Sequence, residues 1–111
     1  MPNEPSLGEF EQLVLLAILR LKREAYGVSI RAEISTRTGR EPASGALYTT
    51  LDRLEQKGLL TSRIGEPTPQ RGGRAKRYYK ATAAGVAAIT RAQRALRNML
   101  DGLAFPGDSR A

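Results

Sequence analysis

The chain has 111 residues, which allows one small domain with a modest core, and 41% of these residues are hydrophobic. It contains no Cys and no His, which excludes disulfides, Cys/His zinc sites, imidazole catalysis and thiol nucleophiles, so we expect no cofactor and no enzymatic activity. The formal net charge of +7 favours an anionic partner, either nucleic acid or an anionic membrane surface.

The positive charge is concentrated in one segment. Residues 1–60 contain equal numbers of acidic and basic residues, whereas residues 61–80 contain six Lys or Arg and a single acid, Glu66. The longest apolar run, 13–19, is far shorter than the ~20 residues of a membrane-spanning helix. No charged and apolar leader with a cleavage site opens the chain, so the sequence predicts a cytoplasmic protein with no membrane partner.

The chain begins with two Pro and no periodicity, so we expect residues 1–6 to be a flexible N-terminus. Segment 7–24 predicts a helix because apolar residues recur at helical spacing. Further leucines make its middle apolar on nearly every side, so either a second surface covers this helix or it is buried within its own domain. The residues at helical spacing are Leu7, Phe10, Val14, Ala17, Ile18 and Leu21, and the further leucines include Leu13, Leu15, Leu16 and Leu19.

Two more helices are predicted before the charged segment. A short helix near 27–38 has Gly39 as a suitable C-terminal cap. The next helix, over about 45–57, can be capped by Ser44 at its start and ended by Gly58 in the left-handed conformation. The apolar anchors of the two helices are Val28, Ile30 and Ile34 in the first, and Leu47, Leu51 and Leu54 in the second.

A β-hairpin and a last helix complete the predicted fold. Segments 59–64 and 75–82 favour strands, and turn-forming Gly and Pro lie between them. The final helix starts after Thr82 and ends near Gly102. Three helices, a hairpin and one more helix describe a winged helix-turn-helix, a mostly α fold of the α+β class. We divide the chain into the flexible residues 1–6, a DNA-binding domain over 7–81, a C-terminal dimerisation helix over 82–104 and a flexible tail over 105–111.

The third predicted helix would be the recognition helix, whose N-terminal part enters the major groove. Ser44 and Gly45 are small enough to let backbone amides approach a phosphate, although Ser44 can equally be a plain N-cap. Tyr48 and Thr49 can hydrogen-bond phosphates or base edges, and the alternative role of Tyr48 is packing. Asp52 would repel phosphate, so we expect it to pair with a nearby Arg.

The basic run 71–77 would lie at the tip of the hairpin, where it can contact the DNA backbone or a minor groove. A run of charge is otherwise a solvated face, but its place beside the recognition helix favours DNA. Tyr78 and Tyr79 alternate along the strand, so one of them faces the core, and the pattern leaves open which. The wing residues predicted to contact DNA are Arg71, Gly73, Arg74, Lys76 and Arg77.

The stretch from Leu7 to about Ile89 resembles the PadR family (phenolic acid decarboxylase regulator) of bacterial winged-helix transcriptional regulators. The motifs that carry the resemblance are LVLLAIL in the first helix, AYGVSI opening the second, SGALYTTLDRLEQKGLL through the third and GGRAKRYYKATAAG from the wing into the last helix. The resemblance implies a homodimer that acts mostly as a repressor on a pseudo-palindromic operator in double-stranded DNA. It places Tyr48 of the ALY motif on DNA, together with Arg71, Arg74 and Lys76 of the wing.

The resemblance is to the short subgroup of the family, which has a single C-terminal helix. It implies that the dimer forms through the first and the C-terminal helices, which would cover their apolar faces. Some short members bind planar drugs beside a Trp on that last helix, whereas this chain has no Trp, so no particular small-molecule effector is implied. The residues expected at the dimer interface are Phe10, Leu13, Leu16, Ile89, Leu96, Met99, Leu100 and Leu103.

Three functions stay open at this point. A sequence-specific dimeric repressor predicts salt-sensitive binding to an inverted repeat. A non-specific architectural nucleic-acid binder predicts equal affinity for all duplexes. A winged helix that binds an acidic protein predicts no duplex binding even at low salt. The single RGG triplet has only a superficial likeness to RNA-binding tracts, which repeat it.

Overall fold

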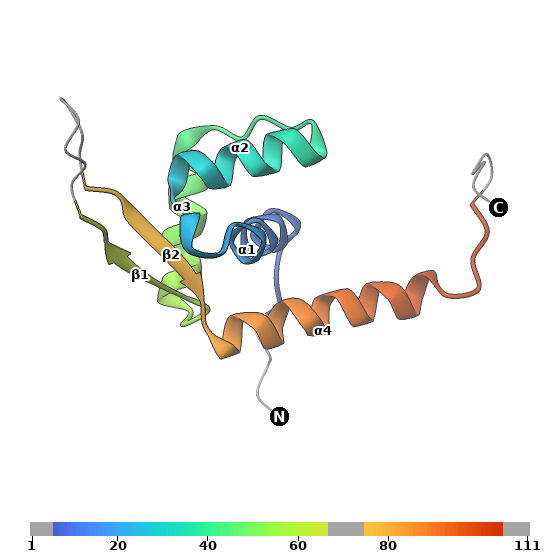
Figure 1. Ribbon diagram of the computed structural model, residues 1–111. Helices are drawn as coiled ribbons and strands as arrows, with labels where there is room; N and C mark the ends of the chain where they lie inside the picture. Colours follow the sequence, from blue (N-terminus) through green and yellow to red (C-terminus); the bar gives the residue numbers. More distant parts are fainter. Residues whose placement is uncertain (1–5, 67–74, 106–111) are drawn as a thin grey trace.

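The computed structural model describes residues 6–66 and 75–105. Most residues of the two segments predicted to be flexible, 1–6 and 105–111, lie outside these ranges, and so does most of the predicted wing tip. Figure 1 shows α1 at the centre, the hairpin on one side, and α4 running outward from the base of the hairpin. This is the predicted winged helix-turn-helix. In chain order the elements are α1 (Glu9–Leu21), the 3₁₀ helix η1 (Lys22–Glu24), α2 (Gly27–Thr38), α3 (Ser44–Gln56), β1 (Leu60–Ile64), β2 (Arg77–Ala81) and α4 (Ala83–Leu100).

Helix α1 is the centre of the core, because it packs against α2, α3, β2 and α4. One side of α1 is buried within this domain, as one interpretation predicts, and the other side is half-buried, where cover by a second surface stays a prediction. The buried side chains of α1 include Val14, Leu15 and Ile18, and the half-buried ones include Phe10, Leu13 and Leu16. The predicted stripe of α3, Leu47, Leu51 and Leu54, is fully buried, and each such leucine stabilises the fold by about 1.5–3 kcal/mol.

Most helix ends lie where the local chemistry predicts them. Gly39 and Gly58 follow α2 and α3 with φ angles of 75° and 77°, in the left-handed region. The Thr82 hydroxyl accepts a hydrogen bond from the Gly85 N–H at 3.0 Å and so caps α4. The prediction that Ser44 caps α3 is wrong. Ala43 occupies the cap position, and Ser44 is already the first residue of the helix.

The hairpin is antiparallel, with Ser62 opposite Tyr79 and Arg63 opposite Tyr78. Tyr79 is the tyrosine that faces the core, where burial raises the pKa of its hydroxyl, and Tyr78 is half-buried on the opposite face. Strand β2 is also tied to the segment before α2. The Tyr79 N–H donates to the Ala25 carbonyl at 2.8 Å, and Tyr78 forms a β-bridge with the residue that precedes α2. The wing is therefore fixed to the start of α2 as well as to the core.

Among the described residues, α4 packs on the rest of the fold only through its first half. A Cβ on Gly85 would overlap the Leu59 carbonyl oxygen, so the helix start approaches the α3–β1 turn closely, and Ile89 is buried. The second half is exposed and extends away from the other helices (Figure 1). The radius of gyration of 16.4 Å exceeds the ~13 Å of a compact domain of this length. None of the helices in the described ranges is long and apolar enough to traverse a bilayer.

Candidate nucleic-acid interface

The first two turns of α3 form an exposed polar face opposite its buried leucines. Ser44, Gly45, Tyr48 and Thr49, the four predicted contact residues of this helix, are all exposed. Because Ala43 has no side-chain acceptor, the first N–H groups of α3 are not capped by a side chain. These free donors and the positive end of the helix dipole can bind a phosphate.

Tyr48 is held in place at the start of α2. A Cβ on Gly27 would overlap the Tyr48 hydroxyl, so the ring lies directly against the first residue of α2. Tyr48 nevertheless keeps 46% of its surface exposed. It is thus both a packing residue and an exposed side chain, and the two predicted roles are compatible. Beside it, α2 and α3 border a groove of about 360 Å³, where Val28 is 68% exposed.

The orientation of α3 is fixed by two polar contacts outside its exposed face. At its N-terminal side, Arg31 Nε of α2 donates to the Pro42 carbonyl at 2.6 Å and braces the turn between the helices. At its C-terminal side, Lys57 Nζ lies 2.9 Å from the Glu11 carboxylate of α1. Burial opposes ionisation of Glu11, but the Gly8 N–H and the Lys57 ammonium outweigh it and hold the pKa of this carboxyl below its ordinary value.

The base of the wing carries two cations stacked on two tyrosines. Tyr26, just before α2, and Tyr78 of β2 have ring centroids 5.5 Å apart. Arg63 Cζ lies 4.6 Å from the centroid of the Tyr78 ring, and Lys76 Nζ lies 5.1 Å from that of Tyr26. No ion pair within the described part of the chain involves Arg63 or Lys76. Their charges are therefore not neutralised, although their positions are fixed.

Arg77, also predicted to contact DNA, is bound to its own chain. Its guanidinium donates to Ser62 Oγ at 2.9 Å, and that hydroxyl donates to the Glu55 carboxylate of α3 at 2.8 Å. These bonds direct Arg77 toward the C-terminal half of α3. The other predicted wing contacts, Arg71, Gly73 and Arg74, lie outside the described residues.

The expected ion pair between Asp52 and an Arg is not formed within residues 6–66 and 75–105. Asp52 stays exposed one turn beyond Tyr48 and Thr49. Its negative charge disfavours phosphates at this turn. The part of α3 that can approach an anion is therefore its N-terminal end.

Three residues of this surface, namely Tyr26, Val28 and Arg63, are not among those that the sequence predicts to contact DNA. Tyr26 contacts the wing through its bridge to Tyr78 and through Lys76, and periodicity does not report such contacts between distant segments. The prediction that Val28 is an apolar anchor of α2 is wrong, because the residue is 68% exposed and its burial would depend on how far α3 covers that helix. Arg63 could have been found, because a cation on the strand that pairs with a tyrosine-rich strand is a candidate for stacking.

The residues predicted at a dimer interface divide into three groups. Leu96, Met99, Leu100 and Leu103 are exposed at 59%, 76%, 41% and 61% along the outer half of α4 and just beyond it. Phe10, Leu13 and Leu16 are half-buried on α1. Ile89 differs from both groups, because it is only 4% exposed and its burial needs no partner.

Comparisons with known proteins show the family and the fold. The chain matches the Transcriptional regulator PadR-like family over residues 15–91. It is 45% identical over 78 residues to Transcriptional regulator Rv3488 of Mycobacterium tuberculosis (strain ATCC 25618 / H37Rv), a match that covers 68% of this chain and 66% of that relative. A PadR family transcriptional regulator from Eggerthella lenta DSM 2243 has a TM-score of 0.66 at 27% identity, covering 85% of this chain and 81% of that chain. A PadR family transcription regulator from Clostridium difficile R20291 shares the fold, with a TM-score of 0.68 at 24% identity over 81% of this chain and 90% of that chain.

Proposed function

Because the chain belongs to the PadR-like family of transcriptional regulators, we propose that it is a homodimeric repressor that binds a pseudo-palindromic operator in double-stranded DNA. The observation that carries the DNA-binding part is the exposed, uncapped start of α3 beside a wing base with unneutralised cations. An anion that lies across this surface meets free N–H donors on one side and cations on the other.

The start of α3 enters the major groove in this proposal. The backbone amides at Ser44 and Gly45 bind a phosphate, and Tyr48 adds a hydroxyl donor next to them. Thr49, one residue further along the exposed face, is the best placed to read a base edge, either through its hydroxyl or through contact of its methyl group with thymine. Sequence preference then depends mainly on Thr49, because the other contacts are made to the backbone.

We assign affinity to the wing. Arg63 and Lys76 lie at its base, and the sequence adds the basic residues Arg71 and Arg74 between β1 and β2 and Arg77 at the start of β2. Gly73 would allow the tip to approach the backbone closely. Contacts of this kind bind any sequence and weaken as salt is added, because they release counterions.

The homodimer is supported by the apolar stripe on the outer half of α4, which no residue within 6–66 and 75–105 covers. Leu96 and Met99 lie on the same side of α4, and both are more than half exposed. Pairing this stripe with the half-buried leucines of α1 in a second copy would remove both from water. Two copies related by a two-fold axis would place their α3 helices about 34 Å apart, one turn of DNA.

Selection of bound duplexes from genomic fragments, followed by fluorescence anisotropy, tests the proposal. We expect an inverted repeat to bind in the nanomolar range and a scrambled duplex to bind far more weakly, with a steep dependence on salt. Equal affinity for both duplexes would instead indicate an architectural binder, and no binding at low salt would indicate a protein partner. Repression is tested by transcription in vitro from a template that contains the selected site, where added protein should lower the transcript yield.

Two substitutions separate the roles of helix and wing. Lys76→Ala should weaken binding to every duplex and lower the salt slope by about one. Thr49→Ala should instead change which bases are preferred at one position of each half-site. If both variants lose affinity uniformly, the division between helix specificity and wing affinity is wrong.

A further inference from the structure

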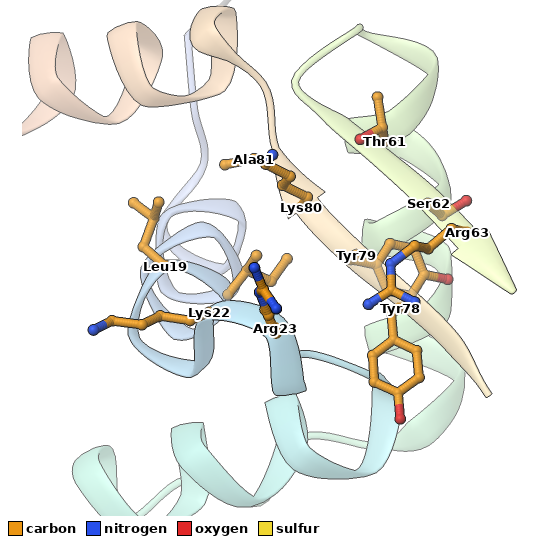
Figure 2. A pocket seen from close by; sticks show the side chains of 11 residues that line it. Leu19, Lys22, Arg23, Thr61, Ser62, Arg63, Tyr78, Tyr79, Lys80 and Ala81 are labelled. Atoms are coloured by element: carbon orange, nitrogen blue, oxygen red, sulfur yellow. The ribbon is translucent and has the colours of Figure 1, made fainter. Parts of the chain in front are cut away.

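A second concave surface lies between β1, β2, η1 and the end of α1, and it shares Arg63 and Tyr78 with the base of the wing. Figure 2 shows the side chains of α1 and η1 on one side of it and those of the hairpin on the other. Its volume of about 600 Å³ is within the ~300–1,000 Å³ of small-molecule sites. Ile18, Leu19 and Ala81 give it an apolar floor.

The rim of this groove is positively charged. Lys22 and Arg23 line it from η1, and Arg63 and Lys80 line it from the hairpin, whereas no acidic side chain lines it. None of the four cations takes part in an ion pair within residues 6–66 and 75–105. Four like charges around one opening repel one another, and an anion bound between them relieves that repulsion.

We propose that this groove binds a small organic anion, with an apolar body against the floor and a carboxylate, sulfonate or phosphate head between the cations. The apolar floor provides hydrophobic contact and the cations fix the orientation, which is the usual division of roles in a ligand site. Arg63 is suited to the head group because its planar guanidinium can donate two parallel hydrogen bonds to an oxyanion.

Two other occupants fit the groove less well. A DNA backbone would use the cations but would gain nothing from the apolar floor. The outer half of α4 from a second copy would suit the floor, but it carries Arg94 and Arg97 beside its apolar stripe and would bring more positive charge to the rim. Only a ligand that is both apolar and anionic complements the two features together.

Occupancy would also be transmitted to the candidate DNA surface, a consequence that rests on the proposed function. Arg63 lines the groove and at the same time stacks on Tyr78 (Figure 2). The Tyr78 ring in turn packs on Tyr26, just before α2. A head group that draws Arg63 toward the floor weakens this stack at the base of the wing. The ligand therefore changes the affinity for DNA through a residue shared by both sites.

The experiment uses the fluorescent anion anilinonaphthalene sulfonate and, as a matched uncharged probe, phenylnaphthylamine, with the full chain. We expect saturable binding of the sulfonate and backbone amide NMR shifts at Leu19, Thr61 and Lys80. Arg63→Gln and Lys80→Gln should each weaken sulfonate binding roughly tenfold, as when a charge-assisted hydrogen bond is lost, and should leave the neutral probe unaffected. Arg94→Gln, which removes a cation from α4, is the control and should change nothing.

Sulfonate shifts confined to the outer half of α4, or equal affinity in the Arg63 and Lys80 variants, would overturn the site. Duplex anisotropy without the probe tests the proposed function separately. If DNA binds, the sulfonate should change that affinity at least severalfold in the unsubstituted protein and not in Arg63→Gln. Probe binding with unchanged DNA affinity would overturn the link between the two sites and leave the anion site standing.

Discussion

Tyr48 of α3 lies against Gly27, the first residue of α2, so closely that any Cβ at position 27 would overlap its hydroxyl. The AYG and ALY motifs are separated in the sequence by the length of α2, and their last residues, Gly27 and Tyr48, contact each other. The contact orients an aromatic side chain that is still 46% exposed. The glycine at the start of α2 is therefore explained by the position of Tyr48 on α3.

Gly27→Ala should displace Tyr48 and disturb the α2–α3 pair. We expect the free energy of unfolding to fall by about 1–3 kcal/mol, as for other insertions into a packed site. DNA affinity should fall as well, because the displaced ring no longer lies beside the start of α3. Urea denaturation measures the first effect and duplex anisotropy the second.

A double-mutant cycle tests whether the steric contact is the cause. In a Tyr48→Ala background the added methyl group at position 27 meets no ring, so the same substitution should cost much less. An equal cost in both backgrounds would mean that Gly27 is required for another reason, such as backbone conformation.

Gly45→Ala should separate stability from DNA binding. A Cβ at this position meets no atom of the described residues within 4 Å, and Gly45 lies in the first turn of α3. Alanine should therefore stabilise the helix by about 0.5–1 kcal/mol. The same methyl group would obstruct a phosphate at the helix start, so duplex affinity should fall. Higher stability with unchanged affinity would contradict the close approach of a phosphate proposed for this turn.

Features that depend on neighbouring residues could be predicted from the sequence. The ends of α2 and α3 follow from the preference of Gly39 and Gly58 for the left-handed conformation. The start of α4 follows from Thr82, whose hydroxyl lies three residues before the amide that it caps. Ser44 shows the limit of this approach. A serine before a helical stripe predicts a cap, but a helix that starts one residue earlier places it inside the first turn.

Features that depend on contacts between distant segments could not be predicted. Alternation along the strand shows that one of Tyr78 and Tyr79 is buried, but only the register with β1 decides that it is Tyr79. The cationic groove likewise combines η1 with the hairpin, and Lys22 and Lys80 are far apart in the chain. The sequence shows which segment carries the excess positive charge. It does not show that the fold divides this charge between the base of the wing and the cationic groove.

Glu11→Gln should destabilise the fold in a pH-dependent way. The folded state holds the pKa of Glu11 below its ordinary value of 4.5, so its ionised form stabilises the fold fully above that pH. This contribution is lost as the pH falls through the lower pKa of the folded state. We expect Gln to cost about 1–2 kcal/mol at neutral pH and nearly nothing once Glu11 is protonated. Urea denaturation of both proteins across the acidic range measures the difference.

Glu9→Gln is the matched control for this prediction. It removes the same charge from the same helix, but the Glu9 side chain is 73% exposed and its partner Arg40 is on the surface. Exposed pairs contribute about 0–1 kcal/mol, so this variant should differ little from the unsubstituted protein at any pH. Similar losses in both variants would assign the effect to net charge rather than to the Glu11–Lys57 pair.

Met99→Glu should dissociate the proposed dimer. Met99 is the most exposed of the large apolar residues on α4, at 76%, and an ionised carboxylate buried against a partner without a matching cation is strongly unfavourable. Asn98→Glu adds the same charge to the adjacent position on the other side of the helix, away from the apolar stripe, and should leave the dimer intact. Light scattering should thus report a dimer for the unsubstituted protein and for Asn98→Glu, and a monomer for Met99→Glu.

Since each protomer then binds a half-site alone, the monomeric variant should also lose most of its affinity for an inverted repeat while binding a single half-site as before. A monomer in all three cases would show that the outer half of α4 is left uncovered for a reason other than dimerisation.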